Sequence, residues 1–391
     1  MLRLPLRTPW VTTHGRISER EVILVRAVVD GADGWGECVA QPEPTYSPEY
    51  TAGALDVLRR HLIPRLLGAR ATPGTRASRS EAAGATSEAA GAAAAGVAPA
   101  LAPVKGHLMA KAALETAVLD AELRAAGVPL AAWLAARCAR PALPAARVVA
   151  GVAVGLAGAD QGALVEEVAG WVDAGYRRVK LKVTPQDHAG AAAVRAAWPD
   201  LALQVDGNGS FAGAGGADVA LGALDQLDRL GLLMIEQPLA DDDLVGHAAL
   251  GRRLSTPICL DESVTGTGTL ATALALGACR VVNLKAGRVG GLLEAVRIHD
   301  RCREAGVGLW CGGMLETGVG RAANLALASL PGFDLPGDLS AADRFWAEDV
   351  VTEPARLEPG GTVAVPTGAG LGVEVRDDLG ALVVSREWHP A

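Results

Sequence analysis

The chain has 391 residues, of which 50% are hydrophobic, and its formal net charge is −8. An acidic chain without a basic stripe cannot neutralise phosphates, so we expect no nucleic-acid partner. The N-terminus lacks the apolar core of a signal peptide, and the Ala/Gly-rich run at 89–103 is broken by prolines, so we expect no membrane partner. The six cysteines form no Cys-x-x-Cys pair, which predicts reduced, buried thiols in a cytoplasmic protein.

The sequence pattern over residues 1–145 predicts a small α+β unit. Two β-rich runs separated by an Asp/Gly turn indicate a hairpin over 21–39. Helical spacing follows at 50–67, and one apolar stripe predicts a long helix over 107–126. Residues 69–103 are mainly Ala, Gly, Ser, Thr and Pro. Because such side chains bury too little surface to offset their ordering entropy, we expect a flexible surface insertion there.

From residue 148 onward, short β-rich runs alternate with helical stretches. The runs lie at 148–154, 177–183, 201–206, 232–236, 257–260, 280–284 and 307–311, and we expect an eighth near 333–335. This alternation predicts βαβ units and a parallel sheet. The expected fold class is α/β, a (β/α)8-type barrel over 146–345. An open doubly wound sheet is the alternative, but it would require a Gly-rich phosphate turn after its first strand.

The C-terminal residues 346–391 contain Pro, Gly and short β-like runs rather than further barrel units. We expect this segment to return to the N-terminal unit, so that both ends of the chain form one α+β capping domain beside the barrel.

Lysine is scarce in this chain, because only five of its 36 basic residues are lysines. They are Lys105, Lys111, Lys180, Lys182 and Lys285. Arginine matches lysine in charge but cannot release a proton at usable pH, so a position that requires a deprotonatable amine cannot accept it. Three of the lysines lie in or at the end of short apolar strands, where surface lysines are unusual. For any single one, ordinary ion pairing is the alternative explanation.

Carboxylates follow three successive strands of the predicted barrel. Asp206, Glu236 and Asp261 each stand at the C-terminal end of a strand, where barrels place functional groups. Converging carboxylates repel one another unless a cation neutralises them, and oxygen ligands select a hard divalent ion. We therefore expect Mg²⁺, for which Mn²⁺ or another divalent ion can substitute. For one Asp alone, a helix N-cap is the competing interpretation.

Lys182 and Lys285 flank these carboxylates on strands two and six, which lie opposite each other in an eight-stranded barrel. Two amines would thus face one bound substrate from both sides. Removal of a proton beside a carboxyl group produces an enediolate, and this chemistry requires a base together with a cation that stabilises the new charge. A catalytically silent barrel with a structural metal is the alternative from another functional class.

These motifs resemble the enolase superfamily, muconate-lactonising subgroup, and within it the o-succinylbenzoate synthase / N-acylamino acid racemase family. Further segments carry the resemblance over nearly the whole chain: Trp35-Gly36-Glu37-Cys38, Tyr46, Lys105-Gly106-His107, Lys180-Leu181-Lys182, Ile235-Glu236-Gln237-Pro238, Cys259-Leu260-Asp261-Glu262-Ser263, Gly312-Gly313-Met314-Leu315-Glu316-Thr317-Gly318 and Pro336-Gly337-Asp338. The superfamily is one that uses a Lys or His base with Mg²⁺.

The resemblance implies a role for each of these site residues. Asp206, Glu236 and Asp261 would bind Mg²⁺, Lys182 would be the general acid/base, and Lys285 would stabilise the enediolate or act as the opposite base. We further expect substrate contacts from Lys180, Tyr46, Asn208, Gly313, Met314 and Glu316. One departure bears on the substrate: Ala153 stands where the family usually carries Ser.

Two activities are compatible with this site. The first is o-succinylbenzoate synthase, the dehydration of 2-succinyl-6-hydroxy-2,4-cyclohexadiene-1-carboxylate in menaquinone biosynthesis. The second is racemisation of N-acylamino acids, and one protein can carry both. Arg288 lies three residues after Lys285, and a lowered pKa of that amine would favour racemisation. In either case we expect a small-molecule carboxylate substrate and a homo-oligomer, either a dimer or an octamer.

Overall fold

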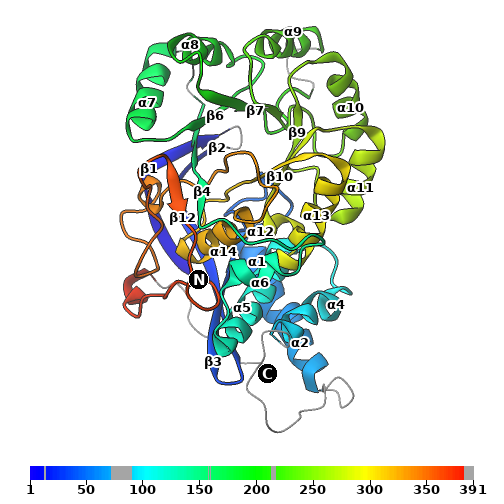
Figure 1. Ribbon diagram of the computed structural model, residues 1–391, viewed down its shortest axis with the longest axis vertical. Helices are drawn as coiled ribbons and strands as arrows, with labels where there is room; N and C mark the ends of the chain where they lie inside the picture. Colours follow the sequence, from blue (N-terminus) through cyan, green and yellow to red (C-terminus); the bar gives the residue numbers. More distant parts are fainter. Residues whose placement is uncertain (13–14, 72–89, 157, 159, 213–216, 383–391) are drawn as a thin grey trace.

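The computed structural model describes residues 1–391 except 13–14, 72–89, 157, 159, 213–216 and 383–391. Figure 1 shows the strands and helices of the parallel sheet in the upper and middle parts of the molecule, with α5 and α6 below them; the blue strands of the N-terminal sheet run down the left side, from near β6 to β3 at the bottom. Among the described residues, no helix combines the length and the apolar character required to cross a membrane.

The N-terminal unit is an antiparallel sheet covered by a long helix. The described strands are β1 (Leu2–Thr12), β2 (Gly15–Val29) and β3 (Ala32–Cys38), paired in that order. The predicted hairpin is β2–β3, and β2 begins earlier than expected because its first half pairs with β1. The predicted helix is α5 (Leu108–Ala126). At Gly34 and Gly36, a Cβ atom would lie 2.2 Å from Ala121 N and 2.0 Å from Ala113 O, so only glycine permits this close packing on α5.

Short helices pack around α5. They are α1 (Thr51–Val57), the π-helical turn η1 (Leu58–Leu62), α2 (Ile63–Ala71), α3 (Ala92–Ala95), α4 (Val97–Leu101) and α6 (Leu130–Ala135). We expected a flexible insertion over 69–103, but residues 92–101 are ordered. Val97 and Leu101 are buried, and Glu122 accepts hydrogen bonds from the first amides of α3. Packing of α3 and α4 on α5, together with the hydrogen bonds to Glu122, thus orders this part. The expected insertion also overlaps the end of α2 at 69–71, and its residues 72–89 lie outside the described residues.

Seven described strands form one parallel sheet, in the order β11-β10-β9-β8-β7-β6-β5. They are β5 (Gly151–Val154), β6 (Arg178–Lys182), β7 (Ala202–Asp206), β8 (Ile235–Glu236), β9 (Ile258–Leu260), β10 (Val281–Leu284) and β11 (Gly308–Cys311). The helices between and after them are α7 (Gln161–Asp173), α8 (Ala189–Ala197), α9 (Ala217–Asp228), α10 (Leu244–Arg253), α11 (Thr267–Leu276), α12 (Ala286–Val289), α13 (Leu292–Ala305) and α14 (Gly318–Ala328).

The eighth position of the barrel is filled by residues 335–338, which are not a regular strand. On one side, Leu335 N donates to Leu309 O at 3.4 Å and Asp338 N donates to Cys311 O at 3.0 Å. On the other side, Gly151 N donates to Gly337 O at 2.8 Å. These bonds connect the two ends of the sheet, so the predicted (β/α)8-type barrel is confirmed and the open sheet is excluded. The expected eighth strand at 333–335 is displaced by a few residues.

The C-terminal segment runs back over the start of the barrel and onto α5. Strand β12 (Thr362–Ala364) pairs antiparallel with β4 (Arg147–Val149), a short 3-10 turn, η2 (Ala342–Arg344), precedes the segment, and another, η3 (Leu379–Leu382), lies within it. Further along, Leu371 N donates to Asp120 Oδ1 at 2.6 Å, and Arg124 pairs with Glu374 at 2.7 Å. Its described residues therefore contact the N-terminal unit as well as the barrel.

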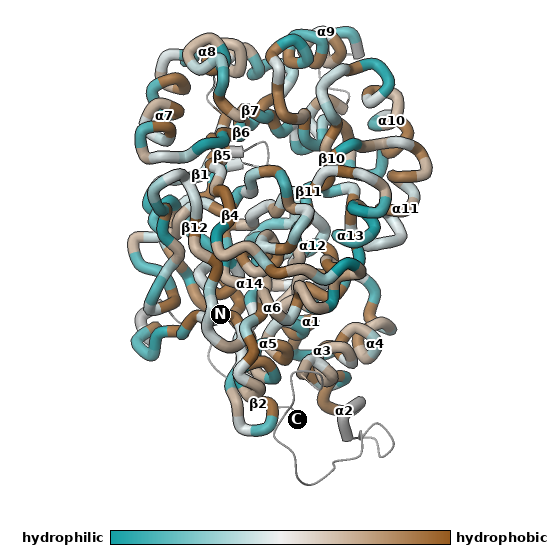
Figure 2. Tube along the Cα trace, viewed as in Figure 1, coloured by the Kyte–Doolittle hydropathy of each residue, from teal (hydrophilic) through white to brown (hydrophobic). Residues whose placement is uncertain are grey.

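The strand period of two separates the core from the site. In β6, Val179 and Leu181 are buried toward the surrounding helices, whereas Lys180 and Lys182 take the other face. Figure 2 shows brown, apolar tube along the barrel strands and teal, polar tube mainly on the outer turns of the surrounding helices. The amphipathic pattern that builds the barrel thus also directs the lysines into its mouth.

Candidate active site

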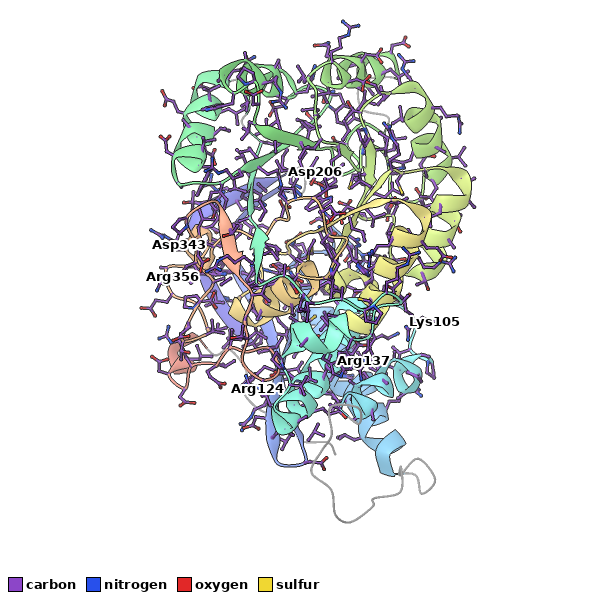
Figure 3. All side chains as sticks on the ribbon, viewed as in Figure 1. Lys105, Arg124, Arg137, Asp206, Asp343 and Arg356 are labelled. Carbon is purple, nitrogen blue, oxygen red and sulfur yellow. The ribbon has the colours of Figure 1, made fainter. Side chains whose placement is uncertain are left out.

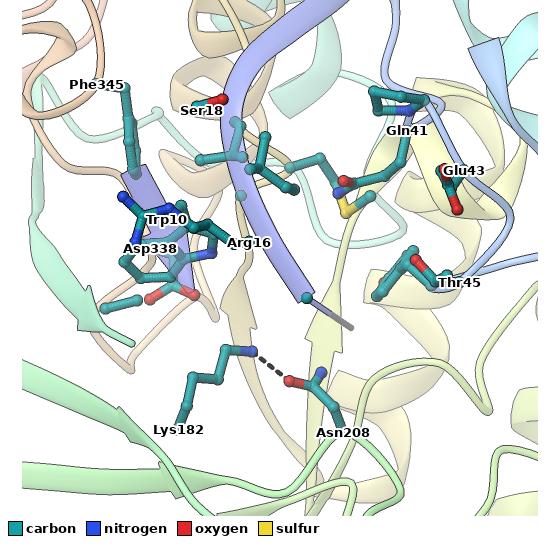
Figure 4. A pocket seen from close by; sticks show the side chains of 18 of the residues that line it. Trp10, Arg16, Ser18, Gln41, Glu43, Thr45, Lys182, Asn208, Asp338 and Phe345 are labelled. Atoms are coloured by element: carbon teal, nitrogen blue, oxygen red, sulfur yellow. Dashed lines mark hydrogen bonds between the residues drawn. The ribbon is translucent and has the colours of Figure 1, made fainter. Parts of the chain in front are cut away.

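A cavity of about 560 Å³ lies between the C-terminal ends of the barrel strands and the N-terminal unit. This size suits a small organic ligand. Figure 4 shows Lys182 and Asn208 projecting from the barrel, with Trp10, Arg16 and Phe345 across the cavity from them. The predicted site residues that line it are Tyr46, Lys180, Lys182, Asn208, Lys285, Gly313 and Met314, together with Ala153.

At the cavity wall, the ammonium group of Lys182 donates hydrogen bonds to two oxygen acceptors. Its Nζ lies 2.6 Å from Asp206 Oδ2 and 2.5 Å from Asn208 Oδ1. Asn208 adopts a left-handed backbone with φ of 42°, and its amide N donates to Asp206 Oδ1 at 3.0 Å. Burial opposes the charge of Asp206, but Lys182 and Lys180 outweigh it and lower the pKa of this carboxyl group.

Lys180 is buried among three carboxylates. Its Nζ lies 2.6 Å from Asp338 Oδ2, 3.1 Å from Glu236 Oε2 and 3.2 Å from Asp206 Oδ2. Burial alone would lower its pKa, but these carboxylates together raise the pKa of Lys180. The second oxygen of Asp338 pairs with Arg178 at 2.5 Å, so this carboxylate joins two buried cations.

Asp338 was missed as a site residue by sequence reasoning, although the Pro336-Gly337-Asp338 motif was recognised. The rule that placed the other carboxylates would have found it, because Asp338 ends the segment at the eighth barrel position. The irregular backbone there hides the strand signal: Pro336 and Gly337 interrupt any β pattern in the sequence.

Glu236 is fully buried at the end of β8. Asn283 Nδ2 donates to its Oε1 at 2.7 Å, and Lys180 reaches its Oε2. Burial, together with the neighbouring negative charge of Asp206, raises the pKa of Glu236. The negative charge of Asp206 therefore opposes the ionisation of Glu236.

Lys285 lies beside Asp261 and a residue from the N-terminal unit. Its Nζ is 2.8 Å from Asp261 Oδ2 and 3.1 Å from the Tyr46 hydroxyl. Burial opposes its charge, but Tyr46, Glu262 and Glu236 raise the pKa of Lys285. The lowered pKa suggested by the position of Arg288 is therefore wrong: Arg288 is an ion-pair partner of Asp261 instead, and it donates to Asn283 O at 2.7 Å.

Glu262 adds a further carboxyl group next to Asp261. Its Oε1 accepts from Asn208 Nδ2 at 2.8 Å, while its Oε2 is buried without a hydrogen-bond partner among the described residues. Burial, followed by the negative charge of Asp206, raises the pKa of Glu262 to about 7. A buried acceptor without a donor costs free energy, which favours a cation nearby.

The predicted metal ligands fit a hard divalent ion in chemistry. Asp206, Glu236 and Asp261 are each at most 1% exposed, and they offer only oxygen atoms. Their oxygens do not all lie within 4.8 Å of one another among the described residues, and an ammonium group of lysine lies against each carboxylate. The orphaned Glu262 Oε2 adds a further oxygen to this set. The buried charge therefore suits Mg²⁺ better than zinc, which prefers nitrogen and sulfur ligands.

Two glutamates hold the Gly312–Gly318 loop in place through hydrogen bonds. Glu316 does not line the cavity; its Oε1 accepts from Met314 N and from Asn324 Nδ2, both at 2.7 Å. Glu37, from β3, accepts from Thr317 N at 3.1 Å and Gly320 N at 2.9 Å, at the start of α14. The N-terminal sheet thereby holds the loop that presents Met314 to the cavity.

Comparison with known proteins agrees with this architecture. Residues 163–379 match the enolase C-terminal domain-like family, and residues 2–134 match the N-terminal domain of the mandelate racemase / muconate lactonizing enzyme family. This enzyme therefore belongs to the enolase superfamily. The predicted membership is confirmed, and members of the superfamily generally use a divalent metal ion.

Among its relatives, this enolase-superfamily enzyme is 46% identical to an N-succinylamino acid racemase from Amycolatopsis sp, over 99% of this chain and 96% of that protein. It is 38% identical to o-succinylbenzoate synthase of Bacillus subtilis, over 97% of this chain and 93% of that protein. A solved structure of a probable mandelate racemase from Alicyclobacillus acidocaldarius superposes with a TM-score of 0.86 at 38% identity, covering 98% and 94% of the two chains. Relatives with both expected activities are thus similar over nearly their full length.

Proposed function

We propose that this enzyme is an o-succinylbenzoate synthase, which removes water from 2-succinyl-6-hydroxy-2,4-cyclohexadiene-1-carboxylate through an enediolate and so serves menaquinone biosynthesis. The observation that carries the proposal is that Lys182 and Lys285 line one cavity from opposite sides of the barrel, on β6 and immediately after β10. The proposal is supported by relatives with this activity, among them the B. subtilis enzyme.

In this proposal, Lys182 is the base. Its neutral amine takes the proton from the carbon beside the carboxyl group, and the resulting ammonium then returns a proton to the departing hydroxyl group, which leaves as water. Lys285 approaches from the other side as a cation and stabilises the negative charge of the enediolate. Asn208 and Asp206 orient Lys182 through its two short hydrogen bonds.

Asp206, Glu236 and Asp261 are the residues that would hold Mg²⁺, and Mn²⁺ or another divalent ion can take its place. When bound, the ion neutralises the buried carboxylates and stabilises negative charge on a substrate carboxylate. With these carboxylates engaged, Lys180 becomes available to pair with the substrate carboxylate. Its remaining partner, Asp338, keeps it charged.

The remaining cavity residues serve recognition in this proposal. Tyr46 from the N-terminal unit closes the side next to Lys285, and Gly313 and Met314 close another wall. Ala153 offers no hydroxyl group where the family usually has one, so the substrate contact is apolar there. Glu316 acts by holding Met314 in place rather than by touching substrate.

N-succinylamino acid racemisation is the second candidate. Racemisation needs a base on each face of the enediolate, whereas dehydration needs one. The presence of Lys285 as well as Lys182 in a chain with few lysines favours it, and so does the 46% identity to the racemase of Amycolatopsis sp. One site can perform both reactions because they share the proton-abstraction step.

A direct assay tests these proposals. The purified protein, with Mg²⁺, is given the cyclohexadiene carboxylate and, separately, each enantiomer of an N-succinylamino acid. Dehydration with a loss of activity in Lys182→Ala supports the first proposal, and interconversion of enantiomers supports the second. Activity toward neither substrate would reject both.

Three wider proposals accompany this function. All six cysteines, which lie in the described part of the chain, are free and buried, which suits a cytoplasmic enzyme. We propose domain boundaries at 1–145, 146–345 and 346–391, where the last segment rejoins the first. We also propose a dimer or octamer, which sedimentation analysis of the purified protein tests.

A further inference from the structure

Three side chains with metal-ligand chemistry meet outside the active-site cavity. They are Cys138, His299 and Asp300, whose ligand atoms all lie within 4.8 Å of one another, and none of them lines the cavity. Cys138 follows α6, in the segment that leads from the N-terminal unit to the barrel, and the other two belong to α13. In Figure 3, Arg137, which precedes Cys138, lies beside α5 and α6, apart from Asp206 in the barrel mouth.

The imidazole of His299 is oriented for coordination. Its Nε2 lies 2.9 Å from Pro331 O, and because a carbonyl oxygen only accepts, Nε2 carries the proton. The fully buried ring also stacks on Phe333, with centroids 5.5 Å apart. Nδ1 therefore faces Cys138 Sγ at 3.9 Å and Asp300 Oδ1 at 3.1 Å. A backbone carbonyl behind the second ring nitrogen is the usual arrangement for a metal-binding histidine.

The carboxylate of Asp300 is oriented in the same way. Ala139 N donates to its Oδ2 at 2.8 Å, which leaves Oδ1 directed at His299 Nδ1. In the neutral imidazole, both facing atoms are acceptors, and two acceptors 3.1 Å apart repel unless a proton or a metal cation joins them. The thiol of Cys138 stands on the third side of the same point.

The separations fit tetrahedral coordination. Metal distances of about 2.3 Å to sulfur and about 2.0–2.1 Å to nitrogen and oxygen place S and N about 3.6 Å apart, and N and O about 3.3 Å apart. The observed values of 3.9 Å and 3.1 Å differ from these by a few tenths of an ångström. We propose that Cys138, His299 and Asp300 form a second metal site, separate from the Mg²⁺ site, for a borderline divalent ion such as Zn²⁺.

Binding releases the thiol proton of Cys138 to solvent and leaves the fourth position for water. A surface cleft lined by Ala139, Arg140 and Asp300 lies beside the cluster. Of the charges near Cys138, Asp300 favours the cation and Arg303 opposes it. The ion ties the segment between α6 and β4 to α13, so it fixes the connection between the N-terminal unit and the barrel.

Cobalt is a suitable probe, because Co²⁺ takes the same ligands as zinc and reports a thiolate ligand by charge-transfer absorption. The full-length protein is stripped with EDTA, returned to excess Mg²⁺ to occupy the hard-ligand site, and titrated with Co²⁺. We expect one equivalent to produce the absorption band and Zn²⁺ to abolish it. Absence of a band in the wild-type protein would mean that a proton alone joins His299 and Asp300, and the proposal would be rejected.

Variants locate the site. Cys138→Ala should lose the band, and Cys302→Ala is the matched control, because Cys302 is a free, buried cysteine in α13 outside the cluster. Asp300→Asn keeps an acceptor for Ala139 but loses the charge, so it should weaken Co²⁺ binding at least about tenfold. Asp300→Asn also tests the proposal if Cys138→Ala does not fold. A band that persists in Cys138→Ala, or unchanged affinity in Asp300→Asn, would overturn the assignment.

Discussion

The hydroxyl group of Tyr46 lies 3.1 Å from Nζ of Lys285, so a residue of the N-terminal unit completes a site whose charged groups come from the barrel. The ammonium group also lies 4.8 Å from the centre of the Tyr46 ring. Both contacts depend on how the two parts of the chain pack, and neither follows from the barrel sequence alone.

Tyr46→Phe keeps the ring but removes the hydrogen bond to Lys285. A hydrogen bond to a charged group contributes about 1.5–3 kcal/mol, and Tyr46 raises the pKa of Lys285, so its loss favours the neutral amine and reactions that use Lys285 as a base should speed up by about tenfold. Dehydration through Lys182 should change less. Rates of both reactions, measured on the same preparation, check this. Tyr50→Phe is the control, because Tyr50 is 41% exposed and does not line the cavity.

Removing one proposed metal ligand should affect metal binding and activity together. We expect Asp261→Asn to weaken Mg²⁺ binding by at least about tenfold and to lower kcat/KM, and we expect excess EDTA to abolish activity in the wild-type protein. Calorimetric titration of Mg²⁺ and steady-state assays provide the measurement. Asp242→Asn, in an exposed turn, should change neither. Full activity in EDTA would contradict the metal assignment.

Glu115 should make stability depend on pH. It is buried in α5 and accepts from Leu293 N at 3.0 Å, and burial raises its pKa to about 7. Between its unfolded pKa of about 4.5 and about 7, the folded state holds the proton and the unfolded state does not. Stability should therefore be greatest at the acidic end and fall by about 3 kcal/mol as the pH rises through this window.

Denaturant unfolding at pH 5 and pH 8 measures this contribution. Glu115→Gln cannot titrate, so its stability should vary less between the two pH values than that of the wild-type protein. Glu304→Gln, which changes an exposed glutamate of α13, should behave like the wild-type protein. If Glu115→Gln keeps the full wild-type pH dependence, another group is responsible for it.

The ordered part of the predicted insertion should contribute to stability. Leu101 of α4 is fully buried, so Leu101→Ala should cost about 2–5 kcal/mol of unfolding free energy through lost burial and a cavity. Leu143→Ala is the comparison, since Leu143 is 90% exposed and should change little. Equal effects of the two substitutions would mean that α4 does not pack on the core in solution.

Regular strand periodicity made most of the site predictable. Lys182, Asp206 and Lys285 were placed because each ends a strand of alternating pattern, and a parallel barrel brings such ends together. Asp338 was missed because Pro336 and Gly337 erase the pattern of its segment. The role of Arg288 was misjudged for another reason: sequence distance from Lys285 suggested repulsion of the amine, whereas the fold directs the guanidinium group to Asp261.

The N-terminal unit was harder to predict in detail. The close contact of Gly34 and Gly36 with α5 and the support of the Met314 loop by Glu37 join residues far apart in the sequence. No local pattern encodes such contacts. The order of 92–101 was missed for a related reason, because small residues such as Ala94 gain burial only when a partner helix is already in place.

The central claim is that Lys182 and Lys285 act on opposite faces of one enediolate. Lys182→Ala should abolish dehydration and racemisation. Lys285→Arg keeps a cation near the enediolate but removes its base, so it should retain part of the dehydration activity while losing interconversion of amino-acid enantiomers.

The most direct measurement is exchange of the α-proton in D₂O, followed by NMR for each enantiomer of an N-succinylamino acid with Lys285→Arg. The account predicts that one enantiomer exchanges through Lys182 and that the other does not. Equal exchange of both enantiomers would show that Lys285 is not the second base, and would contradict the placement of the two lysines on opposite faces.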